Sequence, residues 1–186
     1  KIYQTAGYNC PVIDLMTQIR SRHELSPSDV AQITVDMNWL ETLYPSPEFP
    51  NTERNAASVG STHYFTAYTF IHGFYPPLKA RIIPDMEGDA EEQQVLDLLQ
   101  KVEVVGHKDR PAFAPHIAIQ MRDGTTYEGE YNGTELQWGL ETEISRISEL
   151  FSDMDWPREK LEALVQTVST LEEQPSIDSM IQLCVR

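Results

Sequence analysis

The feature that most constrains the fold is a β-hairpin signal in the second half of the chain. Residues 115–121 and 125–131 alternate apolar and polar side chains, and Asp123-Gly124 lies between them. Asp-Gly is a preferred pair for a tight hairpin turn. A similar alternation over residues 33–37 and a short apolar run over 102–105 predict two further strands. The chain must therefore build a sheet with at least one buried face.

Helical segments separate these strands. Apolar side chains recur at helical spacing after Pro11, which predicts a helix with Asn9 or Cys10 at its cap and Pro11 at its first position. A second helix is predicted over residues 56–72, because the segment is apolar on nearly every side, as a buried helix is. Gly73 follows as the expected C-cap glycine.

The rest of the chain completes the predicted architecture. Residues 39–55 contain three prolines and are expected to be irregular. The chain ends in three predicted amphipathic helices, and Pro157 and Pro175 are expected at the first position of two of them. Strands joined through helices indicate an α+β fold, a small mixed or antiparallel sheet with a hairpin packed against helices. We expect an α+β domain over residues 1–134 and the C-terminal helices over 135–186.

Composition excludes several classes of function. The chain has 186 residues, of which 40% are hydrophobic, so it is long enough to bury a core without a disulfide or metal. Its formal net charge of −15 repels phosphate backbones and anionic lipid, so neither a nucleic acid nor a membrane is an expected partner. The longest apolar stretch, residues 64–74, is shorter than the ~18 residues that a membrane span requires.

Cysteine and histidine positions give no metal or redox motif. Cys10 and Cys184 lie far apart and neither belongs to a CxxC pair, and the five histidines lack metal-ligand spacing. No secretory leader is recognisable, and a reducing, cytoplasmic compartment is predicted. The sequence begins with Lys1 rather than Met, which predicts a fragment or a processed product.

Two segments carry candidate site residues. In the first, Lys1, Tyr3 and Tyr8 precede a helix start, where a cation, phenols and backbone N–H groups are able to hold a carboxylate together. Alternatively, the tyrosines pack and the lysine is simply exposed. In the second segment, His63 and Tyr64 lie on the predicted buried helix. A tyrosine hydroxyl at a cleft donates a proton or orients a substrate, whereas a packed tyrosine has one satisfied hydrogen bond.

An ordered set of short motifs links these segments. Lys1, Tyr3, Tyr8 and Pro11 follow the pattern Lys-x-Tyr-Pro-x-Cys-Arg-Tyr-x-His-Pro, and a Ser-Pro-Ser-Asp-Val turn follows at residues 26–30. Later motifs are a Ser-x-x-Tyr-x-x-Ala helix over residues 61–73, Lys-Val-Glu-Val at 101–104 and Arg-Asp-Gly at 122–124. In this order the motifs resemble the C-terminal part of the MmgE/PrpD family, which includes 2-methylcitrate dehydratase, cis-aconitate decarboxylase and an iminodisuccinate epimerase.

The resemblance implies the lid portion of a larger, cofactor-independent lyase or isomerase acting on small di- or tricarboxylates. In such an enzyme a helical main domain, built from upstream residues and the final helices, would be a partner of this α+β lid. The apolar stripes of the C-terminal helices would lack that partner in this chain, so we expect the chain to self-associate as a homo-oligomer. The chemistry begins with proton abstraction next to a carboxylate. Loss of water, loss of CO2 or reprotonation then follows.

The resemblance also implies roles for individual residues. Lys1 falls on the family lysine that binds or polarises a substrate carboxylate, and Tyr64 falls on a tyrosine that reaches the active site. Tyr8 and His63 would contact substrate, and Asn9 and Cys10 would shape the helix entry beside it. The remaining acid–base groups would precede Lys1, so this chain alone is expected to be inactive.

The first segment departs from the family pattern at residues with functional side chains. Ala6 replaces its Cys or His, Gly7 replaces its Arg and Cys10 replaces its His. Loss of the arginine removes a bidentate carboxylate clamp, and loss of the histidine removes a group that titrates near neutral pH. These changes suggest a divergent substrate. They leave open an alternative function, a non-catalytic ligand-binding or assembly module.

Overall fold

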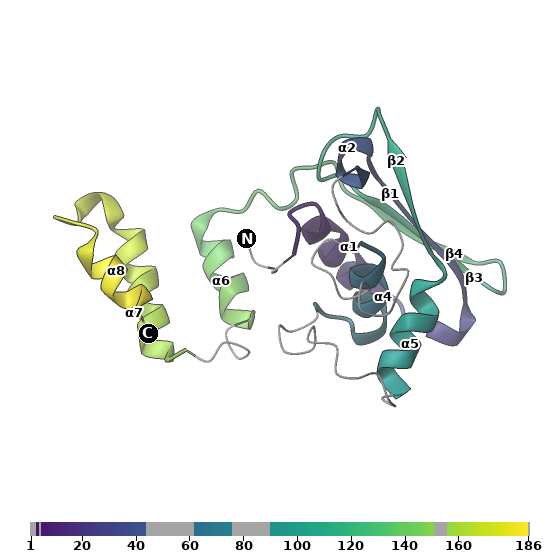
Figure 1. The fold of residues 1–186 in the computed structure, drawn as a ribbon, viewed down its shortest axis with the longest axis horizontal. Coiled ribbons are helices and arrows are strands. Elements are labelled where there is room, and N and C mark those ends of the chain that lie inside the picture. The colour runs from purple at the N-terminus through teal and green to yellow at the C-terminus, as the bar shows by residue number, and fades with distance from the viewer. Residues whose placement is uncertain (1–2, 4, 44–61, 76–89, 151–155, 186) are drawn as a thin grey trace. The chain divides into compact units, whose positions relative to one another are not determined.

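The computed structural model describes Tyr3 and residues 5–43, 62–75, 90–150 and 156–185. Contacts divide the chain into two compact units, one over Tyr3–Gln137 and one over Trp138–Arg186 (Figure 1).

The first unit is built on one four-stranded mixed sheet. Its strands are β1 (Val30–Asn38), β2 (Val102–His107), β3 (His116–Met121) and β4 (Thr126–Glu130), in the order β2-β1-β3-β4. β1 pairs in parallel with β2 and antiparallel with β3, and β3 and β4 form the hairpin. The predicted mixed sheet with a hairpin is therefore confirmed, and the alternating residues of β1 and β3 place their apolar members on the buried face.

Helices cover one face of this sheet. They are α1 (Asn9–Arg22), α4 (Thr62–His72) and α5 (Ala90–Leu99), and Figure 1 shows α1 and α4 side by side. The core holds large side chains with less than 2% exposure from all these layers: Phe65, Phe70, Ile13, Met16, Leu98, Ile33 and Ile119. Gly73 ends α4 with a φ of 69°, as expected of a C-cap glycine.

The segment after β1 is more regular than its prolines suggested. A short helix, α2 (Trp39–Thr42), begins directly after the strand. Asn38 and Glu41 form a capping box that satisfies N–H groups at its start, a local signal outweighed in the prediction by the prolines that follow. The rest of that stretch, and residues 56–61 of the second predicted helix, lie outside the described residues.

The second unit contains α6 (Leu140–Leu150), α7 (Arg158–Ser169), a 3-10 turn at Leu171–Glu173 and α8 (Asp178–Cys184). The three predicted C-terminal helices are therefore confirmed, but both proline positions were wrong. Pro157 is the N-cap residue of α7. α8 begins three residues after Pro175, because the Ser176 Oγ accepts the Asp178 N–H at 3.2 Å and holds a turn there. Among the described residues of both units, no helix is long and apolar enough to cross a bilayer.

Candidate functional site

Two helix starts lie together on the sheet. The Thr62 Oγ1 at the start of α4 donates to the Asn9 Oδ1 at the start of α1, at 2.7 Å. Near the other ends, the Arg20 Nε of α1 donates to the Phe70 carbonyl oxygen of α4 at 2.6 Å. The two helices therefore run parallel, with both N-termini at the same end. We call this end the α1–α4 junction, consisting of Thr5, Tyr8, Asn9, Cys10, Thr62, His63 and Tyr64.

A buried polar network holds the junction. The Asn9 Nδ2 donates to the Thr5 Oγ1 at 3.1 Å, so the Asn9 amide links Thr5 to Thr62. Thr5 and Asn9 are fully buried and Thr62 is 5% exposed. The Thr66 Oγ1 then donates to the Thr62 carbonyl oxygen at 2.8 Å. Buried polar groups are expensive unless paired, so this network fixes the relative position of the two helix starts.

The start of α1 is closed by its own backbone. The Asn9 N–H donates to the Ala6 carbonyl oxygen at 3.0 Å, and the Cys10 N–H donates to the Gly7 carbonyl oxygen at 3.1 Å. Tyr8 occupies the N-cap in a helical conformation and makes no side-chain cap. The backbone N–H groups of Asn9 and Cys10 are therefore already hydrogen-bonded at this helix start. The dipole of the helix still favours negative charge there.

Tyr64 lies in an aromatic layer on α4. Its side chain is 5% exposed, and its ring packs edge-on against Phe65 at 5.6 Å and beside Tyr68 at 5.7 Å between ring centroids. Tyr3, near the N-terminus, packs on Tyr75 at 4.9 Å, and Tyr75 stacks on Phe65 at 6.2 Å. The N-terminal segment and α4 are thus parts of one aromatic cluster, with the Tyr64 phenol among its buried members.

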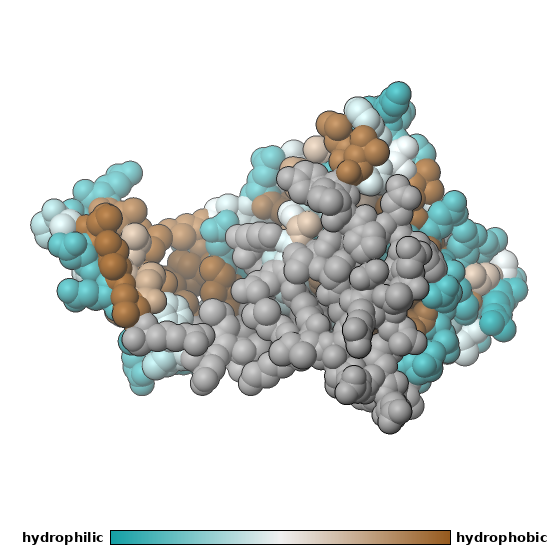
Figure 2. All heavy atoms as spheres, viewed as in Figure 1, coloured by the Kyte–Doolittle hydropathy of each residue, from teal (hydrophilic) through white to brown (hydrophobic). Residues whose placement is uncertain are grey.

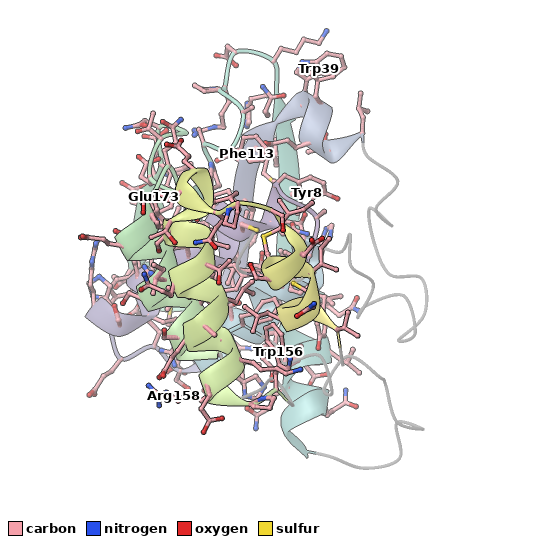
Figure 3. All side chains as sticks on the ribbon, turned by 90° about the vertical axis from the view of Figure 1, so that its left-hand side faces the viewer. Tyr8, Trp39, Phe113, Trp156, Arg158 and Glu173 are labelled. Atoms are coloured by element: carbon pink, nitrogen blue, oxygen red, sulfur yellow. The ribbon has the colours of Figure 1, made fainter. Side chains whose placement is uncertain are left out.

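The other predicted site residues have different environments. His63 is 8% exposed, and burial lowers its pKa to about 4, so its imidazole is neutral at physiological pH. Tyr8 is buried, whereas Cys10 is half-buried and its thiol forms no disulfide. The Phe113 ring lies beside Gly7, the residue before Tyr8 (Tyr8 and Phe113 are labelled in Figure 3). Lys1, the predicted cation of the site, lies outside the described residues.

A second titratable cluster lies on the sheet face opposite the helices. The Asp36 carboxylate meets the His107 Nε2 at 2.6 Å and the His116 Nδ1 at 2.9 Å, and the His116 Nε2 is 3.5 Å from a Glu128 oxygen. Burial alone would raise the pKa of Asp36, but hydrogen bonds and charge from the two imidazoles bring it below its usual value. The cluster ties β1 to both neighbouring strands.

A buried carboxylate of α1 anchors the end of the hairpin. The Tyr131 Oη donates to the Asp14 Oδ2 at 2.5 Å, and both residues are at most 6% exposed. Burial, followed by the hydrogen bond to Asp14, raises the pKa of Tyr131, so this phenol stays protonated. The pair fixes the last residue of the hairpin against α1.

Sequence reasoning missed Thr62 and the Asp36 cluster. A polar residue such as Thr62 at a helix start is a capping signal. Its hydrogen-bond partner, Asn9, is 53 positions away, and no local sequence pattern indicates that contact. Asp36 and His116 stand on the polar side of their alternating strands, so their shared face was readable. The parallel register of β2, which brings His107 close to Asp36, could not be predicted from the sequence. Among the residues whose positions are described, no group of three side chains is able to hold a metal ion.

Comparison of the chain with protein-family models and with curated proteins found no match.

Proposed function

We propose that this chain is the lid portion of a cofactor-independent lyase or isomerase that acts on small di- or tricarboxylates, with its substrate at the α1–α4 junction. The proposal rests on the MmgE/PrpD resemblance. The observation that carries it is the Thr62–Asn9 hydrogen bond, because it joins the two segments that resemble the family's substrate-contacting motifs. Those segments are 53 residues apart in the chain.

Electrostatics at the junction supports an anionic ligand. The chain as a whole carries a net charge of −15, so a carboxylate needs a local positive field to bind. Two parallel helices with adjacent N-termini supply such a field, since each helix start carries a partial positive charge. His63 adds no charge at neutral pH, because its pKa is about 4. A full positive charge would come from Lys1.

The residues of the junction take distinct roles in this proposal. Tyr64 donates a proton or orients the substrate, and Lys1 polarises a carboxylate. The neutral imidazole of His63 exchanges hydrogen bonds with the ligand. Asn9 holds the helix starts at a fixed distance, and Tyr8 and Cys10 border the ligand. One lysine and one tyrosine do not form a complete acid–base pair, so the chain alone binds substrate without turning it over.

Binding is tested by titrating the isotope-labelled chain with citrate and with cis-aconitate, using acetate as the monocarboxylate control. We expect amide chemical shifts to move at Tyr8–Cys10 and at the first turn of α4. Tyr64→Phe should weaken binding, whereas Tyr68→Phe removes a hydroxyl from the same helix and should leave binding unchanged. Shift changes confined to other elements, or the same response to acetate, would contradict the proposed site.

Catalysis is tested in the longer protein that the resemblance implies. Tyr64→Phe should reduce turnover of the accepted polycarboxylate by about 100-fold or more, the usual contribution of a positioned proton donor. Unchanged turnover would remove Tyr64 from the chemistry. Polycarboxylate binding at the junction without any turnover in the longer protein would favour the alternative, a non-catalytic ligand-binding module.

A further inference from the structure

The second unit exposes apolar side chains along all its helices. None of its residues with described burial is buried, in contrast to the core of the first unit. Its large apolar side chains are 36–59% exposed at seven positions: Leu140, Ile147, Val168, Leu171, Ile177, Ile181 and Val185. Figure 2 shows the corresponding hydrophobic surface over α6 and over α7 and α8. Faces of this extent mark interaction sites.

The charge around these faces is negative and largely unpaired. Trp138–Arg186 contains ten acidic and four basic residues, so the acids predominate. Six carboxylates have no ion-pair partner among the described residues: Glu141, Glu143, Glu159, Glu172, Glu173 and Asp178. Glu143 lies one helical turn from the exposed Ile147, and Asp178 lies one turn from the exposed Ile181. Figure 3 shows Arg158 at the start of α7 and Glu173 in the 3-10 turn beyond the end of that helix.

The basic side chains with described positions are already engaged within the unit. The Arg158 Nε lies 3.3 Å from a Glu162 oxygen, and the Lys160 Nζ donates to the Val185 carbonyl oxygen at 3.0 Å. The Arg146 guanidinium stacks over the Trp138 ring at 5.4 Å. The unit therefore offers apolar contact area and negative charge, and its described cations are used internally.

We propose that the apolar faces of α6, α7 and α8 bind an amphipathic helix whose apolar face is bordered by lysine or arginine. Apolar burial supplies most of the binding free energy, and the bordering cations pair with the free carboxylates and set the orientation. A second copy of this chain is a poorer occupant, because it brings the same excess of carboxylates to the interface. Anionic lipid is repelled for the same reason.

The test uses the complete chain and synthetic helical peptides. One peptide carries leucine and lysine at amphipathic spacing, a second carries glutamate in place of lysine, and a third is a scrambled leucine–lysine sequence. Binding is followed by calorimetry at two salt concentrations, with sedimentation of the chain alone in parallel. We expect the amphipathic lysine peptide to bind at least about tenfold more tightly than either control, and less tightly at higher salt.

A pair of matched variants locates the binding face. The double variant Ile177→Ser, Ile181→Ser removes exposed apolar side chains from the second unit and should weaken binding at least about tenfold. Leu40→Ser, Leu43→Ser removes equally exposed leucines from the first unit and should have no effect. Equal binding of the scrambled or glutamate peptide, or no loss in the isoleucine variant, overturns the proposal. Self-association of the chain that the isoleucine variant abolishes also overturns it, because a second copy would then fill the face.

Discussion

The helices of the two units are buried to different extents. In the first unit, α1 and α4 bury their apolar sides completely, and Ile13, Phe65 and Phe70 have no exposed surface. In the second unit, the apolar stripes of α6 and α7 stay partly exposed, as at Ile147 and Val168. The difference is the sheet, which gives α1 and α4 a broad apolar surface to cover. A stripe in the sequence indicates a face that requires a partner, and it does not identify the partner.

The sharpest test of this comparison exchanges one apolar side chain in each unit for alanine. Phe65→Ala opens a cavity in the sealed core and should lower the free energy of unfolding by about 3–5 kcal/mol. Ile147→Ala, at a position already 36% exposed, should cost less than about 1 kcal/mol. Urea unfolding of both variants measures the two values. Similar losses would mean that the second unit is covered in solution.

The dependence of the free energy of unfolding on pH tests whether His63 is buried and neutral in the first unit. The pKa of His63 falls from 6.5 to about 4 on folding, so the unfolded chain binds more protons between these values. Above pH 6.5 the neutral His63 does not lower the free energy of unfolding. As the pH falls from 6.5 toward 4, His63 lowers the free energy of unfolding by up to about 3 kcal/mol. His63→Leu should remove this slope, whereas His72→Gln, at the exposed end of α4, should retain it. An unchanged slope in His63→Leu would contradict the buried, neutral imidazole.

Three threonine-to-valine variants sharpen the comparison for polar contacts. Thr62→Val leaves the buried Asn9 carbonyl without its donor and should cost about 1–3 kcal/mol. Thr69→Val should instead stabilise by about 1 kcal/mol, because the buried Thr69 Oγ1 has no hydrogen-bond partner among the described residues. Thr167→Val, on the exposed surface of α7, should change stability by less than about 0.5 kcal/mol. Thermal unfolding of the three variants measures these changes in stability. A stabilising effect of Thr62→Val would show that the α1–α4 junction is hydrated.

The candidate site could be predicted only in parts. Sequence patterns placed Asn9 or Cys10 at the cap of the first helix, whereas the N-cap residue of α1 is Tyr8. They placed His63 and Tyr64 on a buried helix, and both residues are buried on α4. The junction of those starts depends on Thr62, whose bond to Asn9 follows from the packing of two helices on the same sheet face. The low pKa of His63 follows from the burial of a helix that the apolar pattern had predicted to be buried, but the pattern does not predict the pKa itself. The role of Lys1 in binding a carboxylate stays a prediction, as do the substrate class and the homo-oligomeric state.

Local chemistry in the sequence determined the hairpin, the alternating strand β1 and the existence of the helices, because turn residues and apolar spacing act over a few neighbouring positions. Only the tertiary structure decided the parallel pairing of β1 with β2, the joined helix starts and the contact of His107 and His116 with a shared carboxylate. These contacts link residues far apart in the chain. Their formation depends on which surfaces bury apolar area together, a property of the whole fold.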